Sequence, residues 1–239
     1  MKRCMVITML LLPMAFMRSW AQNTELDYLS LLDKAMYMER ATLKMEMYKD
    51  DKKVRQYEMD FYRSDHKMRM EFTAPAVEKG RRMLNDNASL WMYLPRTSKV
   101  MKLPFKQSFM GSDASNSDLM RMSFKVDYEL TEVGGVNDEG MMVLKLKAKD
   151  LDVAYPAVTL LYDKRRNVPL KQEMYSLSGK LIKTILYEDI IREGDGYMPS
   201  TMIIKEALQK NTLTKLLYSN IQKKQRQPAE FFTLGSLRR

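Results

Sequence analysis

Few side chains in this chain of 239 residues could perform catalysis. It has one histidine, His66, and one cysteine, Cys4, so the nitrogen and sulfur ligands from which zinc sites are usually built are scarce. Asp113 and Asp118 stand in loop-forming sequence, where solvation or helix capping accounts for them. There is no GxSxG nucleophile elbow, no phosphate-binding glycine loop and no HExxH motif. We therefore expect no enzyme activity, no metal site and no cofactor.

Methionine is the residue type that the sequence uses unusually often, with 23 in the chain. Methionine side chains are flexible and polarisable, so they suit surfaces that accept apolar chains of variable shape. The alternative is an ordinary core in which methionine replaces leucine. Either way, the chemistry that these residues offer is apolar contact.

One short segment, Leu90–Leu94, must be an unusual strand. It is apolar at every position, and neighbouring residues of a strand point to opposite faces of the sheet. Both faces of this strand therefore need a cover. One face needs a core, and the other needs a second cover or a ligand.

The segment Phe105–Leu119 is too rich in glycine, serine, aspartate and asparagine for a core strand. It still carries bulky apolar side chains that would be costly to leave in water. We expect it to be a mobile lid over a groove; a surface loop with a short helix capped at Ser115 or Asn116 is the alternative. The expected lid residues are Phe105, Phe109, Met110 and Gly111.

Several motifs of this region occur together in one known family. They are LWMYLPRTSKV at 90–100, QSFMGSD at 107–113 and DL at 118–119, and they continue through Tyr155–Pro156, Lys171–Leu181 and Tyr187–Asp189 to Pro199. This pattern resembles the outer membrane lipoprotein-sorting family, the relatives of the periplasmic carrier LolA. The resemblance implies a mainly β fold with helical cover: a LolA/LolB-like, incompletely closed antiparallel β-barrel with a helix and loop lid.

Alternating apolar and charged residues predict three antiparallel strands after residue 42. Since a slip of one residue would expose every apolar side chain, alternation fixes which residues share a face. The residues expected to line a lipid-binding groove on the concave face are Met45, Met47, Met59, Phe61, Met68, Met70 and Phe72, joined by Trp91 and Tyr93 of Leu90–Leu94. The residues expected to face water are Lys44, Glu46, Lys67 and Arg69.

One helix and several further strands are also predicted. Helical periodicity in Thr24–Met38 predicts one amphipathic helix before the strands. Further strands are expected at Arg81–Asn85, Lys99–Leu103, Phe124–Leu130, Met141–Lys147, Ala157–Tyr162, Pro169–Tyr175, Leu181–Glu188, Met198–Ile204 and Thr212–Tyr218.

The N-terminus predicts export. Lys2 and Arg3 precede an apolar run, and small residues at Ser19 and Ala21 complete the pattern of a cleavable signal peptide over residues 1–21. Residues 22–239 would then form a single LolA-like domain without a thiol, located in the periplasm. The net charge of +10 permits attraction to anionic membranes, while export argues against nucleic acid as a partner.

These observations predict a non-enzymatic function. We expect a periplasmic carrier that binds lipid or lipoprotein acyl chains in a hydrophobic groove and moves them between membranes toward the outer membrane. Such a carrier acts as a chaperone for its cargo. Its expected partners are an inner-membrane extractor or exporter and an outer-membrane acceptor. The alternative is a lipid- or lipoprotein-sensing accessory module for a membrane protein or exporter.

Overall fold

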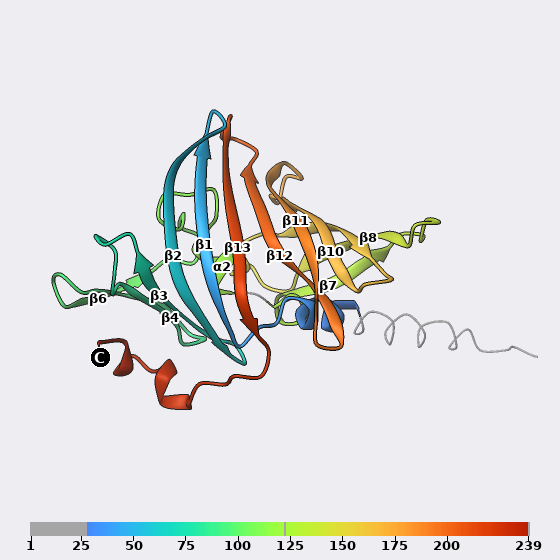
Figure 1. Ribbon diagram of the computed structural model, residues 1–239. Helices are drawn as coiled ribbons and strands as arrows, with labels where there is room; N and C mark the ends of the chain where they lie inside the picture. The colour runs from blue at the N-terminus through green and yellow to red at the C-terminus, as the bar shows by residue number, and fades with distance from the viewer. Residues whose placement is uncertain (1–27, 122, 239) are drawn as a thin grey trace, which may run out of the picture.

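The computed structural model describes residues 28–121 and 123–238. The expected signal peptide and Cys4 lie outside the described residues. A 13-stranded antiparallel sheet dominates the molecule (Figure 1). The strands are β1 (Arg40–Lys49), β2 (Lys52–Ser64), β3 (Lys67–Ala74), β4 (Arg82–Asn85), β5 (Leu90–Leu94), β6 (Lys99–Leu103), β7 (Tyr128–Val133), β8 (Met141–Ala148), β9 (Ala157–Asp163), β10 (Val168–Tyr175), β11 (Leu181–Glu193), β12 (Gly196–Glu206) and β13 (Thr212–Gln222).

The chain builds this sheet outward from its middle. Strands β1 to β6 follow one another as neighbours, the chain then crosses to the opposite edge, and β7 to β13 return until β13 pairs with β1. The two ends of the sheet are β6 and β7, so the barrel is not closed. This confirms the predicted mainly β fold, an incompletely closed antiparallel barrel with helical cover.

Turn chemistry sets the register where the strands meet. Asp50 and Asp51 connect β1 to β2, and both have positive φ, 48° and 60°. Two such residues form the type I′ turn, whose twist matches that of the flanking strands. The result is a tight hairpin in which Lys49 lies opposite Lys52. An irregularity between Met47 and Tyr48 then shifts the register by one residue, so that Met45 and Leu43 lie opposite Tyr57 and Met59.

Two predicted elements differ from the structure. The described part of the first helix spans residues 28–35 and ends before Met38. The predicted strand Phe124–Leu130 is wrong in its first half, where α3 (Phe124–Asp127) precedes β7. The reason is capping: Ser123 caps α3, and the carboxylate of Asp33 accepts the backbone N–H of Phe124 at 2.6 Å from 91 residues earlier in the chain.

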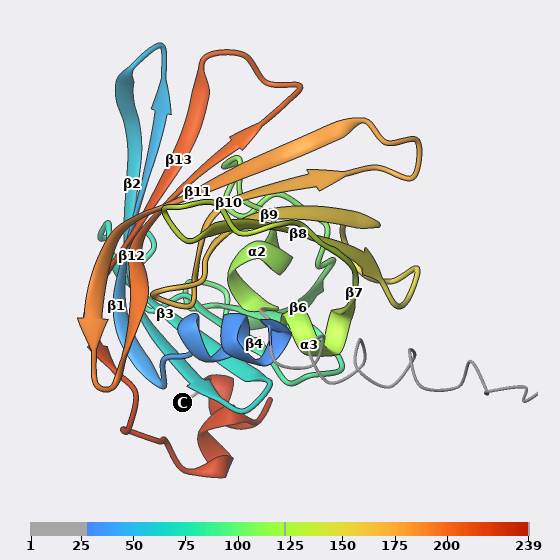
Figure 2. The same cartoon turned by 90° about the vertical axis from the view of Figure 1, so that its right-hand side faces the viewer.

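The sheet curves around a small helical layer (Figure 2). Helix α2 (Asn116–Met120) lies inside the curve, and α3 and the helix 28–35 lie on its open side. The main hydrophobic cluster fills this concave interior, and Leu29, Leu32 and Met36 belong to it. The apolar stripe of the first helix therefore packs on the core, as its periodicity predicts.

A second, smaller cluster lies on the convex face. It joins Leu84 of β4 to Phe232 and Leu237, which belong to the short helices η2 (Ala229–Phe232) and η3 (Ser236–Arg238). Figure 1 shows this C-terminal segment running back beneath β3 and β4. Among the described residues, no helix has both the length and the apolar composition needed to cross a bilayer.

Candidate functional site

The concave interior gathers most of the residues predicted to line a groove. Met45, Met59, Met68 and Met70 are at most 1% exposed, and all belong to the main cluster. Phe61 and Phe72 are buried with them, and half-buried Met47 packs against the same cluster. The strands β1, β2 and β3 thus form one methionine-rich wall.

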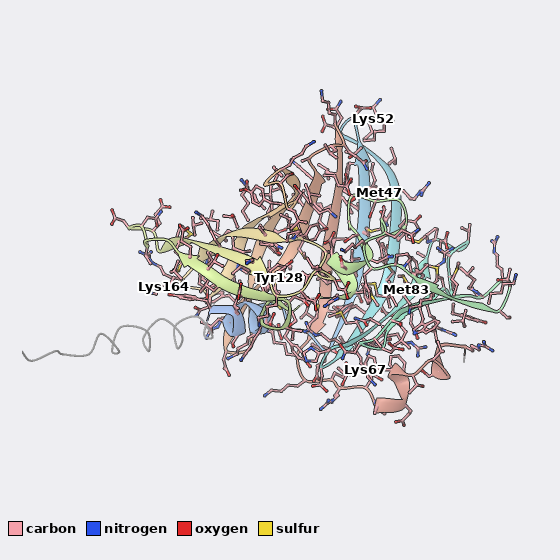
Figure 3. All side chains as sticks on the ribbon, turned by 180° about the vertical axis from the view of Figure 1, so that it is seen from behind. Met47, Lys52, Lys67, Met83, Tyr128 and Lys164 are labelled. Carbon is pink, nitrogen blue, oxygen red and sulfur yellow. The ribbon has the colours of Figure 1, made fainter. Side chains whose placement is uncertain are left out.

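The structure extends this wall beyond the predicted residues. Met83 of β4 lies opposite Met70 of β3 on one side and Met92 of β5 on the other, and Figure 3 shows Met47 and Met83 along the wall. Met142, Met174, Met198 and Met202 add to the same cluster from the other half of the sheet. Each lies in a predicted strand, so the alternation that identified the first group could have identified these too.

Trp91 and Tyr93 require a correction. They lie on the convex face, where they pack against the second cluster under the C-terminal segment. Their strand neighbours Leu90 and Met92 face the interior instead. Because every residue of Leu90–Leu94 is apolar, alternation could not tell the two faces apart.

The prediction that Glu46 and Arg69 face water also requires a correction. Lys67 is exposed and the Lys44 side chain is 41% exposed, as predicted, but Glu46 and Arg69 are buried. The Arg69 guanidinium donates to the Phe231 carbonyl oxygen at 2.8 Å and lies 4.1 Å from the centre of the Phe231 ring. The C-terminal segment therefore covers a position that the strand pattern assigns to water.

The predicted lid, Phe105–Leu119, lies inside the concave interior. Phe109 is fully buried and stacks on Phe72, with ring centroids 6.1 Å apart and planes at 11°. Phe105 and Met110 are half-buried against the same cluster, whereas Gly111 is exposed. Met110 and Gly111 both have positive φ, 54° and 75°, so the chain reverses sharply there. This segment thus contributes side chains to the concave interior.

Asp113 attaches the lid to the sheet. Its carboxylate accepts hydrogen bonds from the hydroxyls of Thr212, at 2.6 Å, and Thr214, at 2.9 Å, both on β13. The backbone N–H of Asp113 in turn donates to the Thr214 hydroxyl oxygen at 3.0 Å. Asp113 is 4% exposed, so the simple solvation expected from the sequence is wrong for this carboxylate.

Asp118 forms a second attachment, through a buried ion pair. Its Oδ2 lies 2.6 Å from Nζ of Lys183 on β11, and the side chains are 3% and 2% exposed. Tyr155 donates to Oδ1 at 2.9 Å, and Asp118 also forms a capping box with Ser115 at the start of α2. Burial, and then the Asp118 charge, raise the pKa of Tyr155 far above its ordinary value, so this phenol remains a donor.

The sequence contained a signal for Lys183 that our prediction missed. Lys183 occupies the same face of β11 as the buried residues Ile185 and Tyr187. A lysine at an inward position of a strand needs a buried counter-charge, because an unpaired ammonium inside a protein is costly. The partner is an aspartate 65 residues earlier, which strand alternation cannot identify.

Arg81 and Arg82, which are neighbours in the chain at the start of β4, also have structural partners. Arg81 forms an ion pair with Glu78 at 2.6 Å and reaches the sulfur of Met110 in the lid at 3.0 Å. Arg82 donates to the Leu237 carbonyl oxygen at 3.1 Å. These two arginines therefore contact the lid and the C-terminal segment.

Several cavities lie near the lid, and one of about 400 Å³ is lined partly by Met68 and by Phe105 and Lys106 of the lid. One of about 80 Å³ lies between α2 and α3 and is lined partly by Tyr128, Tyr155 and Tyr187. Another of about 290 Å³ lies beside the tip of the lid. Pockets for drug-sized ligands usually measure about 300–1,000 Å³.

The described residues do not meet the requirements of a metal site. No group of three or more histidine, cysteine, aspartate or glutamate side chains in residues 28–121 and 123–238 could hold a metal ion. His66 is an exposed turn residue between β2 and β3. The buried carboxylates of the lid are both engaged by hydroxyls or by Lys183.

Comparison with solved structures identifies the class of fold. A LolA superfamily protein from Nitrosomonas europaea, NE2245, is 25% identical, with a TM-score of 0.77 over 88% of this chain and 97% of that one. A domain assigned to outer membrane lipoprotein sorting from Vibrio parahaemolyticus is 22% identical, with a TM-score of 0.74 over 91% and 99% of the two chains. A DUF1329 family protein from Desulfovibrio piger is 17% identical, with a TM-score of 0.75 over 90% and 98%. The fold is LolA-like.

A family model described only as "uncharacterized protein" matches residues 64–239. This match covers more than half of the chain, so the chain belongs to that family. No curated protein matches the chain.

Proposed function

We propose that this protein is a periplasmic carrier that shelters the acyl chains of a lipid or lipoprotein in its concave interior, on the way toward the outer membrane. The observation that carries the proposal is a methionine-rich wall whose space is taken by a lid. The lid is held there by side-chain hydrogen bonds and one ion pair, and its only bridge-like backbone pairing is local, between Ser108 and Ser115, within the described residues. Such contacts can break and re-form without unfolding the sheet.

Energetics favour exchange between lid and cargo. Each CH₂ group removed from water contributes about 0.8 kcal/mol, so a long acyl chain offsets the loss of the contacts that Phe109 makes. Flexible methionine side chains can repack around chains of different length. A carrier must also release its cargo. The lid competes with the cargo for the methionine-rich wall, so its return favours release.

A reversible lock on the lid tests the proposal. Asp113→Cys with Thr214→Cys places two thiols where the native side chains are in hydrogen-bond contact, in a chain also carrying Cys4→Ser. The oxidised protein should take up no fluorescent phospholipid from vesicles, and a reductant should restore uptake. The single variant Thr214→Cys is the matched control and should not respond to reductant. Equal uptake by the oxidised and reduced double variant would refute a gating lid.

A second readout separates the carrier from a lipid-sensing module. The loaded, reduced protein is mixed with acceptor vesicles, and the label that moves into them is measured. A carrier delivers label to the acceptors, whereas a sensor of the same fold retains it. Absence of any bound lipid in the reduced protein would exclude both functions.

A further inference from the structure

Strand β6 (Lys99–Leu103) is a free edge of the sheet. It pairs with β5 on one side, and the strand order ends there. In the described part of the chain, none of the backbone hydrogen bonds formed outside helices and strands involves a residue of β6. An edge strand of this kind presents N–H and C=O groups to which another strand can pair.

The two faces of β6 differ in character. Met101 and Leu103 lie opposite Met92 and Leu90, which face the interior, so they continue the methionine-rich wall. Met101 is 46% exposed, because no further strand covers it. Lys102 lies opposite Trp91 and therefore belongs to the convex face.

A cavity of about 290 Å³ lies directly beside this edge. Its apolar lining residues are Met83, Met92, Met101, Leu103, Phe109 and Met110. An apolar side chain from an added strand would enter this space next to the tip of the lid. The edge therefore offers both main-chain pairing and a side-chain pocket, which together give affinity and specificity in strand addition.

Charge identifies the occupant that fits. Lys99 and Lys102 are exposed, and neither takes part in a salt bridge among the described residues. A second copy of β6 would bring like charges together, and lysines on edge strands oppose such self-association. Acidic side chains from a different protein would instead be attracted.

We propose that β6 is a docking edge for an extended, acidic segment of a protein partner. The segment adds a strand to the sheet, places an apolar side chain in the methionine-lined cavity and sets carboxylates on the convex face beside Lys102, while Lys99, opposite Leu94 at the start of the strand, adds positive charge on the other face. Because the cavity ends at Phe109 and Met110, the docked segment touches the lid. A partner bound in this way can influence whether the lid stays in place.

The probe is a short fluorescein-labelled peptide of alternating leucine and glutamate, added to the lipid-free full-length protein. Fluorescence anisotropy should show saturable binding that Lys99→Glu with Lys102→Glu weakens about tenfold or more, since two attractions become repulsions. The control, Lys164→Glu with Lys210→Glu, makes the same change in net charge at exposed turns and should bind normally. Lys164 lies across the molecule from Met83 (Figure 3).

Hydrogen exchange locates the peptide. Binding should protect backbone amides of β6, and a peptide of alternating leucine and lysine should not bind. Absence of saturable binding, an equal loss in both variants, or protection confined to another part of the sheet would overturn the proposal. If the double charge reversal does not fold, Lys102→Gln gives the same comparison with a smaller expected loss. The test uses no lipid, so its failure leaves the carrier proposal intact.

Discussion

At the scale of single residues, the outer face of β1 holds a carboxylate that the structure buries. Glu46 accepts a hydrogen bond from the Tyr48 hydroxyl at 2.7 Å and forms ion pairs with Lys44 at 3.0 Å and Lys53 at 3.1 Å. The Tyr48 hydrogen bond, with the two lysines, lowers the pKa of Glu46 from 4.5 to about 2, although burial acts in the opposite direction. The folded state therefore favours the ionised form of this carboxyl.

This lowered pKa predicts a pH-dependent contribution to stability. The contribution is fully present above about pH 4.5 and is lost as the pH falls toward about 2. Glu46→Gln should lower the free energy of unfolding by about 1–2 kcal/mol at neutral pH, and by less at about pH 3. Urea unfolding at both pH values measures this, with exposed Glu188→Gln as the control. A difference that does not shrink in acid would contradict the assignment.

Variants of the ion pair between Lys183 and Asp118 can distinguish its effect on stability from its effect on holding the lid. Lys183→Met leaves a buried carboxylate without its counter-charge and should cost about 3–5 kcal/mol of unfolding free energy. Adding Asp118→Asn removes that charge as well and should restore most of the stability, because neutral groups are cheaper to bury. Denaturant unfolding of both variants provides the comparison.

The control for Lys183→Met is Lys171→Met, which breaks the half-exposed ion pair of Lys171 with Glu173. This variant should lower the free energy of unfolding by about 0–1 kcal/mol. In the double variant the lid should exchange its amide hydrogens faster than in the native protein, since one anchor is gone while the sheet is stable. Unchanged protection of the lid in that variant would show that this pair does not hold it.

At the scale of elements, alternation alone predicts the strands and most of the interior wall. It could not predict burial that depends on distant segments. Arg69 looks like a solvent-facing residue of β3 until the C-terminal segment, 162 residues later, covers it. In the same way, Phe124 looks like the start of a strand because the carboxylate that accepts its backbone N–H, Asp33, belongs to another helix. Composition predicts a lid at Phe105–Leu119, but the position of this segment inside the sheet depends on Asp113 and Asp118, whose partners lie on β13 and β11.

The C-terminal segment should stabilise the fold without contributing to cargo uptake. Phe232 is 1% exposed and packs on Leu84 of the convex face, so Phe232→Ala should lower the free energy of unfolding by about 3 kcal/mol. Leu234, which is 40% exposed, provides the control Leu234→Ala with little expected effect. Thermal or urea unfolding measures the difference, and vesicle uptake is assayed at a temperature where both variants are folded. Reduced uptake by folded Phe232→Ala would mean that this segment is coupled to the interior.

At the scale of the whole molecule, the proposed carrier function gives the interior two alternative occupants, the lid and the cargo. Phe109 stacks on Phe72 inside the wall, so the proposal implies that cargo and lid exclude each other there. The face on which a residue lies should then decide its effect on uptake. Met70→Asp places a carboxylate in the wall and should abolish lipid uptake or folding, whereas Lys67→Asp, exposed on the same strand, should do little. Equal effects would contradict the face assignment.

Mutual exclusion also predicts how the lid responds to loading. The proposed carrier function requires Phe109 to leave its buried position when lipid enters, and the hydrogen bonds of Asp113 to β13 to break. Amides of residues 109–118 should therefore exchange faster in the loaded protein than in the empty one, while those of β5 remain protected in both states. Hydrogen-exchange mass spectrometry on lipid-free and lipid-loaded protein measures this directly. Slower exchange of the lid after loading would mean that it closes over the cargo from outside, and unchanged exchange would mean that the cargo binds without displacing it.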